Sequence, residues 1–366
     1  MNSAGSTSGA GAACARLQKL RANGQPQDID ISCSDYGTAD GRIARYILIA
    51  APPTDIPWRV QYDLSLKSYV GRLPFSGDAL GPYITAMLDD WSQGTPNLTK
   101  RALVWATDYG PTDITRTMAA AIAAPLRDKL NGSVPVEAII GAGAKADALL
   151  SNLDAKPGLV VTSSHGSTPI DNPNLLASTL GLPVGQDRCT VNLNELDAQM
   201  PCGSLWFTQA CCSAGSSGES LYTQLLSADS SAWRVVSQVA ALGSTVAPAA
   251  LRLLGRENPV RAVLGHVEPT FNWTLQDGST GQLYGSVLVT ALSSNLYAGQ
   301  PIGMTLAEYR LQVGLLNTYY HTVRDEAASD TLLRPRLTRL RLTALDRQAL
   351  VLLGDPTVAF PNKDAS

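Results

Sequence analysis

Short apolar runs alternate with longer amphipathic segments along the chain from about residue 43. The runs predict buried strands at 45–50, 102–106, 136–140, 158–162, 204–209 and 261–267, with a further extended piece at 60–66. Apolar positions at helical spacing predict helices at 78–91, 113–130, 144–153, 219–226, 233–242, 285–295, 305–323 and 334–350. Strands separated by helices of this length are typical of an α/β fold, in which a mostly parallel sheet carries helices on both faces.

The same pattern suggests how the chain is divided. Residues 1–27 begin with small, polar side chains and are predicted to be a flexible leader. The 366 residues have room for a large α/β unit with a smaller companion, which we place at 151–366 and 28–150 respectively. Residues 167–200 lack a clear period and are predicted to be a long loop, a feature that usually carries function. The arginine-rich stretch 334–341 is predicted to be a solvated helix face.

Composition excludes several classes of protein. Hydrophobic residues make up 45% of the chain and charged residues 16%, which indicates a globular domain with a sizeable core. A net charge of −3 lacks the basic surplus of a nucleic-acid-binding protein. No apolar run reaches the roughly 20 residues of a membrane-spanning helix. No secretory signal is recognisable, so we expect a cytoplasmic protein with reduced thiols and no membrane partner.

Cysteine and histidine usage argues against a metal site. The six cysteines show neither CxxC pairing nor the spacing of a zinc site, and they are Cys14, Cys33, Cys189, Cys202, Cys211 and Cys212. The chain has three histidines and no HExxH motif. We therefore expect no metal site.

Two predicted strands run directly into residues that can carry chemistry. The run 158–162 leads into His165 and Gly166, and the run 204–209 leads into the adjacent pair Cys211 and Cys212. Ligands of open α/β sheets collect beyond the carboxyl ends of the strands, so a thiol and an imidazole would share one crevice if these strands are neighbours. An imidazole can take the proton of a thiol, whose ordinary pKa is about 8.5. The N–H of Gly166 and that of the nucleophile could then hold an oxyanion.

Other interpretations of these residues remain open at this stage. A cysteine at a strand end can be a small buried hydrophobic residue. However, the order of His165 before Gln209-Ala210-Cys211 matches the caspase signature, in which Gln-Ala-Cys follows the histidine by about 50 residues. A serine hydrolase using Ser213, Ser216 or Ser217 is a weaker alternative, because no GxSxG motif is present.

Several short stretches together resemble the caspase–gingipain–separase clan of cysteine peptidases, and within it the bacterial gingipain-like and CHAT-domain members. They are Tyr46–Ala50 with 55–57 and Tyr69–Leu73, Ser164-His165-Gly166, the segment 210–215, Leu264-Gly265-His266-Val267-Glu268, and 352–356. The resemblance implies a three-layer α/β/α caspase-like sandwich at 151–366, preceded by a smaller gingipain-like subdomain. It also implies a cofactor-free endopeptidase that cleaves a protein substrate after one preferred P1 residue, in a setting such as bacterial defence or programmed cell death.

The resemblance also suggests roles for individual residues. His165 and Cys211 would form the catalytic dyad, with Cys212 as the alternative nucleophile because Gly215 stands three positions after it. Gln209, Glu268 and Asp171 are candidate substrate-binding residues, and the two carboxylates would favour a basic P1 residue. Glu268 could instead be a solvated charge at a strand end, and His266 could simply form a local hydrogen bond. Arg188, on the predicted long loop, is the only cation near the predicted site. The alternative function is a peptidase-fold scaffold without catalytic turnover.

Overall fold

The computed structural model describes residues 16–19, 27–30, 35–37, 41–92, 101–276, 280–327 and 330–360. Its centre is an eight-stranded sheet with the strand order β3-β4-β12-β11-β8-β7-β5-β6. Every neighbouring pair in this sheet is parallel except β11 and β12, so the prediction of a mostly parallel sheet is confirmed. The strands are β3 (Tyr46–Ala50), β4 (Tyr69–Leu73), β5 (Ala102–Ala106), β6 (Val136–Ile140), β7 (Leu159–Ser163), β8 (Leu205–Gln209), β11 (Ala262–His266) and β12 (Leu350–Gly354).

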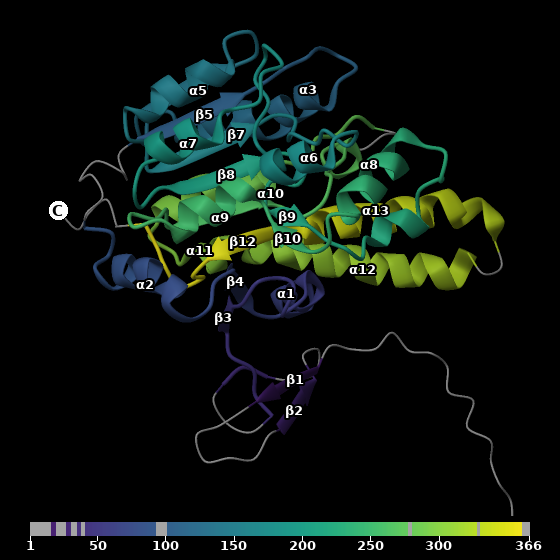
Figure 1. Cartoon of the computed structure of the whole chain (residues 1–366). Helices are drawn as coiled ribbons and strands as arrows, with labels where there is room; N and C mark the ends of the chain where they lie inside the picture. The colour runs from purple at the N-terminus through teal and green to yellow at the C-terminus, as the bar shows by residue number, and fades with distance from the viewer. Residues whose placement is uncertain are drawn as a thin grey trace, which may run out of the picture.

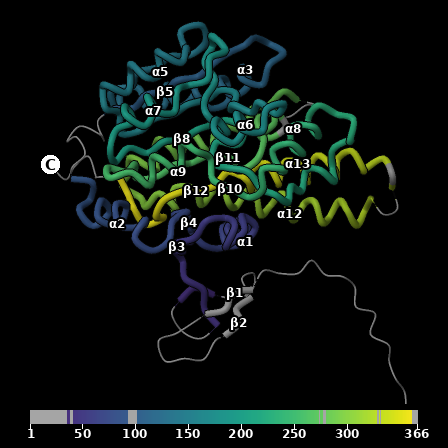
Figure 2. The backbone as a smooth tube through the Cα atoms, in the orientation of Figure 1, coloured from purple at the N-terminus to yellow at the C-terminus, as the bar shows by residue number. Residues whose placement is uncertain are grey.

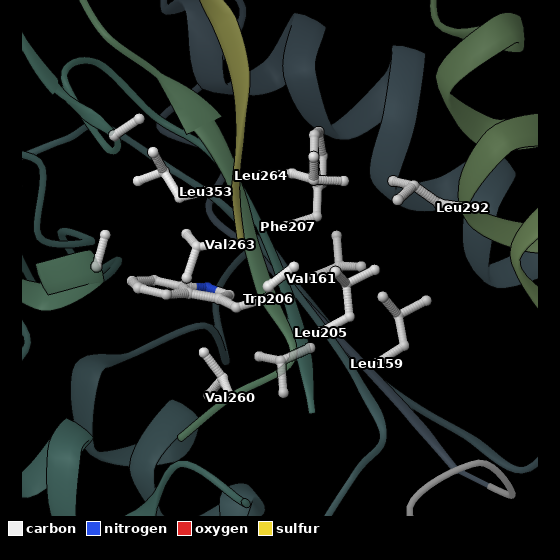
Figure 3. Packing of buried hydrophobic residues seen from close by; sticks show 14 of the residues in the cluster. Leu159, Val161, Leu205, Trp206, Phe207, Val260, Val263, Leu264, Leu292 and Leu353 are labelled. Carbon is white, nitrogen blue, oxygen red and sulfur yellow. The ribbon is translucent and has the colours of Figure 1, made fainter. Parts of the chain in front are cut away.

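The central strands are buried along their whole length. Every residue of β5, β7, β8, β11 and β12 is buried, because helices cover both faces of the sheet and leave no polar side to the strands. Figure 3 shows side chains of this core, among them Val161, Phe207 and Leu264, which belong to one continuous hydrophobic cluster. The continuous apolar runs seen in the sequence are therefore the core of the molecule.

Helices form a layer on each side of the sheet (Figure 1). Helices α2, α9, α7 and α5 contact one another in series on one face, while α4, α10 and α12 do so on the other. The helices are α1 (Trp58–Ser65), α2 (Gly81–Leu88), α3 (Ile114–Met118), α4 (Ala124–Leu130), α5 (Ala146–Leu153), α6 (Pro173–Thr179), α7 (Leu193–Gln199), α8 (Ser231–Ala240), α9 (Pro248–Gly255), α10 (Ser286–Thr290), α11 (Ile302–Thr305), α12 (Ala307–Ala327) and α13 (Arg334–Ala349). Shorter elements are η1 (Gly77–Leu80), η3 (Ala119–Ala123), η4 (Leu221–Gln224), η5 (Asn272–Thr274), η6 (Ala291–Asn295), η7 (Thr331–Leu333), β9 (Gly215–Ser216) and β10 (Thr245–Val246).

Three predicted segments differ from the structure. The stretch 60–66 is mostly the helix α1 and not extended, because Trp58, Gln61 and Leu64 recur at helical spacing and bury one face. The long loop predicted at 167–200 contains α6 and α7, which begin at the side-chain caps Asn172 and Asn192. The helix predicted at 219–226 is reduced to the short element η4.

The predicted boundary at residue 150 does not correspond to a break in the sheet. Strands β3 and β4 lie at one edge, β5 and β6 lie at the other, and the strands of the larger predicted unit lie between them. Part of the predicted leader also forms a strand, because β1 (Arg16–Lys19) pairs with β2 (Gln27–Asp30). The remainder of 1–27 lies outside the described residues.

The long helices α12 and α13 form a hairpin that packs side by side and extends beyond the sheet (Figures 1 and 2). The first half of α13 is partly exposed, as expected for an arginine-rich face, whereas most of Leu342–Ala349 is buried. This buried half brings Asp346 toward the carboxyl ends of β8 and β11. None of the helices in the described part of the chain has the length and apolarity to cross a membrane.

Candidate active site

His165 lies just beyond the carboxyl end of β7. Strand pairing continues one residue past β7, where the N–H of Ser164 donates to the carbonyl of Gln209 over 3.1 Å. His165 follows directly, and its carbonyl accepts from the N–H of Val184 over 3.0 Å. Its side chain remains 34% exposed. The imidazole is thus fixed at the rim of the sheet and stays accessible to a substrate.

Asp113 holds one nitrogen of this imidazole. Nε2 of His165 lies 3.1 Å and 3.0 Å from the two carboxylate oxygens of Asp113. Asp113 caps the amino end of α3, where it accepts hydrogen bonds from the N–H and the hydroxyl of Thr115. Partial burial works to raise the pKa of Asp113, but the hydrogen bonds from Thr115 and His165 outweigh it and leave the pKa below its usual value. Asp113 is therefore a carboxylate at neutral pH.

Cys211 stands on the adjoining loop, beyond the carboxyl end of β8. Strands β7 and β8 are neighbours, and Ser163 is in register with Gln209. Gly166 packs so closely on Cys211 that a Cβ atom at position 166 would lie 2.0 Å from the Cys211 carbonyl oxygen. The structure therefore brings the His165–Gly166 and Cys211 segments together, as the sequence predicted for two neighbouring strand ends.

The thiol of Cys211 is held in a protonated state. It donates a hydrogen bond to the carbonyl of Thr270 over 3.6 Å. Burial raises the pKa of this thiol to about 11, and the carboxyl of Asp346 contributes to the increase. Backbone hydrogen bonding at Thr270 opposes the increase most, followed by that at Cys211 and Gly166. The backbone of Cys211 and that of Gly166 therefore both lie beside the sulfur.

Cys212 has a different environment. Its side chain is fully buried in a small apolar cluster with Leu176, Leu180 and Val239. Its φ angle is +56°, in the left-handed region that non-glycine residues seldom adopt. Burial raises the pKa of the Cys212 thiol well above its ordinary value. The Cys212 thiol is therefore part of the apolar packing, whereas the Cys211 thiol has a polar contact.

A group of buried polar side chains lies beneath Cys211. The carboxyl of Asp346 is fully buried and accepts from the N–H of Phe271 over 3.1 Å and from the hydroxyl of Thr274 over 2.8 Å. Burial raises its pKa to about 6. Nδ1 of His266 lies 3.7 Å from Asp346, and Nε2 of His266 lies 3.3 Å from the side-chain oxygen of Gln209. Burial lowers the pKa of His266 to about 3, so the ring is neutral and takes part in local contacts.

The predicted substrate-binding residues occupy three different environments. Gln209 is buried and faces His266. Glu268 is also buried, at 7% exposure, so it is not the solvated charge that one interpretation of the sequence suggested. Asp171 has a side chain that is 82% exposed and forms an ion pair with Arg234 at 2.5 Å. Arg188 is exposed and lies over the ring of Tyr109.

The candidate serines are engaged in structural hydrogen bonds. The hydroxyl of Ser213 is buried and donates to the carbonyls of Thr208 and Ala210. Those of Ser216 and Ser217 donate to the carbonyls of Gly243 and Glu219. This arrangement does not favour a serine nucleophile. Among the described residues, no group of three or more potential ligands could hold a metal ion.

The buried carboxyl of Glu268 predicts a pH-dependent stability. Burial raises its pKa from 4.5 to about 7, so the folded state keeps this proton at pH values where the unfolded chain has lost it. Stability contributed at this site is therefore highest below about pH 4.5 and falls as the pH rises through 7. In Glu268→Gln this fall should disappear, so the variant should gain stability over the wild type between pH 4.5 and 8 by on the order of 2–3 kcal/mol. Urea unfolding of both proteins across this range measures the difference, and parallel curves would contradict the prediction.

The arrangement of the chain is similar to that in the crystal structure of the Arg-specific cysteine proteinase gingipain R. The two share a TM-score of 0.50 and 13% sequence identity, over 87% of this chain and 65% of the gingipain R chain. The sequence thus spans just under two thirds of the length of that structure. No protein-family model and no curated protein matches the sequence. The predicted caspase-like α/β/α fold is confirmed by this likeness.

Proposed function

We propose that the chain is a caspase-like cysteine endopeptidase in which Cys211 is the nucleophile and His165 the general base. The observation that carries the proposal is the junction of the two strand ends. There, an imidazole anchored by Asp113 and a thiol flanked by two backbone N–H groups lie on adjoining loops that are in contact through Gly166. A nucleophile, a base held by a carboxylate, and oxyanion donors in one place are the components of acyl transfer.

The hydrogen bond to Asp113 gives His165 its function. A carboxylate at Nε2 keeps the proton of the neutral imidazole on that nitrogen and leaves Nδ1 as the proton acceptor. Nδ1 takes the proton of the Cys211 thiol while the sulfur attacks the substrate carbonyl, and the N–H groups of Gly166 and Cys211 hold the oxyanion. His165 then gives the proton to the leaving amine, and water hydrolyses the thioester.

The preferred P1 residue in this proposal is basic, Arg or Lys. Two buried carboxyls lie near the loop that carries the cysteines: that of Asp346 close to the Cys211 thiol and that of Glu268 close to the Cys212 thiol. The structural neighbour gingipain R is described as Arg-specific. Charge-assisted hydrogen bonds from a guanidinium to a desolvated carboxylate are worth about 1.5–3 kcal/mol each. Asp171 contributes less to this preference because its carboxylate is exposed and paired with Arg234.

Peptides that differ only at P1 test both the activity and its specificity. With Arg, Lys, Leu and Asp at P1, we expect cleavage after Arg and Lys to exceed cleavage after Leu and Asp by at least about tenfold in kcat/KM. Glu268→Gln should narrow that difference. Preferential cleavage after Leu or Asp would contradict the basic P1 preference while supporting the peptidase, and the absence of any cleavage would count against the peptidase itself.

A scaffold without turnover is the second candidate function. It is favoured by the state of the thiol, which donates to Thr270 and has its pKa raised to about 11. In the peptidase, a bound substrate has to displace this contact before attack. The wider setting that we propose, a cytoplasmic enzyme acting on a protein in bacterial defence or cell death, rests on the sequence resemblance to gingipain-like and CHAT-domain proteins.

A further inference from the structure

The imidazole of His165 lies against a second aromatic ring. The rings of Tyr109 and His165 are stacked, with centroids 5.4 Å apart and an angle of 14° between their planes. The guanidinium carbon of Arg188 lies 3.6 Å from the centroid of the same Tyr109 ring. Three side chains from three separate segments are therefore stacked together, and the ring of Tyr109 contacts both His165 and Arg188. We call this group the column.

Tyr109 is fixed in place at both of its ends. Its N–H donates to the hydroxyl of Thr115 over 3.0 Å, which ties its backbone to the amino end of α3. Its hydroxyl donates to the carbonyl of Gly185 and also lies 3.4 Å from that of Val184. A ring anchored at both backbone and hydroxyl cannot turn freely, so it presents a fixed surface to the imidazole.

The segment that carries Arg188 is joined to the Tyr109 loop beside the column. The side chain of Gln186 accepts from the N–H of Asp108 over 2.8 Å and donates to its carbonyl over 2.7 Å. Arg188 adopts a φ of +64°, a conformation that costs a non-glycine residue about 1 kcal/mol or more. Its N–H closes the turn by donating to the carbonyl of Gly185 over 2.8 Å. This tight turn holds the guanidinium over the ring.

We propose that Tyr109 is a positioning residue for His165 and that Arg188 holds Tyr109 in its stacked orientation. The inference rests on the proposed function, in which His165 is the base. Asp113 fixes Nε2 of the imidazole but leaves the ring free to swing about that contact. The stacked ring of Tyr109 fixes the plane of the imidazole and thus the direction of Nδ1. Proton transfer depends on this direction, since a misplacement of 1 Å can cost about a hundredfold in rate.

Kinetics of matched variants test the positioning role. Tyr109→Leu removes the aromatic face and should lower kcat about tenfold while KM changes less than about twofold. Tyr109→Phe keeps the stacking and should stay within about threefold of the wild type. Arg188→Ala should lower kcat by about two- to fivefold, and Arg188→Lys should restore most of it. Tyr319→Leu, at an exposed tyrosine of α12, is the control and should leave kcat unchanged.

Proton NMR of the imidazole tests the same inference without relying on activity. The chain has only three histidines, His165, His266 and His321, so their ring signals can be assigned by substitution. Stacking on Tyr109 should shift the ring protons of His165 upfield. Tyr109→Leu should move them downfield, Tyr109→Phe should not, and the other two histidines should stay in place. These shifts would support the column even if the protein cleaved no peptide. A lack of cleavage would count only against the proposed peptidase activity. Unchanged His165 signals and an unchanged kcat in folded Tyr109→Leu would overturn the inference.

Discussion

Cys211→Ala is expected to lower peptidase activity by at least about a thousandfold and to remove labelling by a peptidyl electrophile with a basic P1 residue. Loss of the nucleophile leaves only binding and oxyanion stabilisation, which are minor parts of catalysis by a nucleophile–base pair. The fold should persist, because the thiol is half-buried at the rim of the sheet and its main polar contact is a single hydrogen bond to Thr270. Mass spectrometry of the labelled protein, together with kcat/KM on a P1 Arg peptide, measures both effects.

Cys212→Ala is the matched control. Its side chain packs with Leu176, Leu180 and Val239, so the substitution should lower the free energy of unfolding by about 1 kcal/mol while activity and labelling persist. His165→Ala should abolish activity to a similar extent as Cys211→Ala, since the two act as a unit. Labelling that is lost in Cys212→Ala but kept in Cys211→Ala would transfer the nucleophile to Cys212. Activity retained in both single variants would remove the dyad from the proposal.

The strands at the centre of the fold could be predicted because their environment is uniform. Each of β5, β7, β8 and β11 is buried on both faces, so each begins in the sequence with an unbroken run of at least three apolar residues. Residues that follow such runs lie at the sheet's carboxyl edge. This is why His165 and Cys211 could be placed at that edge from the sequence. The segment 60–66 was less clear, because one face of α1 is solvated and a short amphipathic helix can resemble an extended piece.

The acidic neighbours of His165 and Cys211 could not be predicted, because they depend on how distant segments pack together. Asp113 reaches His165 across 52 positions only because β5 lies next to β7 in the sheet. In the sequence Asp113 is simply the residue that begins a predicted helix, although an acidic cap after the loop that follows a strand was a usable signal. Asp346 is harder still, since it lies on a helix whose arginines indicate a solvated surface, and only the packing of α13 buries it.

The burial of Glu268 could not be predicted from the sequence either. A carboxylate after an apolar strand is compatible with both a solvated strand end and a buried site residue, and the sequence pattern does not separate the two. In the structure the backbone carbonyl of Glu268 accepts from the N–H of Cys212 over 3.1 Å, which draws the strand end against the nucleophile loop and buries the side chain. Its burial is thus a consequence of a contact between distant segments.

Gly166→Ala is expected to lower kcat/KM by about a hundredfold or more while the protein remains folded. A Cβ atom at this position would lie 2.0 Å from the carbonyl oxygen of Cys211 and 3.1 Å from its nitrogen, so the two loops must move apart. All three contacting atoms belong to the backbone of Cys211, so no flexible side chain can absorb the clash. Separation of the loops displaces His165 from the thiol and moves the N–H of residue 166 away from the oxyanion, and each change alone weakens catalysis.

The stability of this variant separates a local from a global effect. Strain of this kind typically costs about 1–3 kcal/mol, which thermal unfolding can measure. Gly314→Ala on α12 is the control, because nothing lies within 4 Å of its added Cβ. A helical Gly→Ala change should stabilise the protein by up to about 1 kcal/mol and leave kcat/KM unchanged. If Gly166→Ala retained wild-type kcat/KM, the close approach of the two strand ends would have no catalytic role, and the oxyanion donor would have to be sought on another segment.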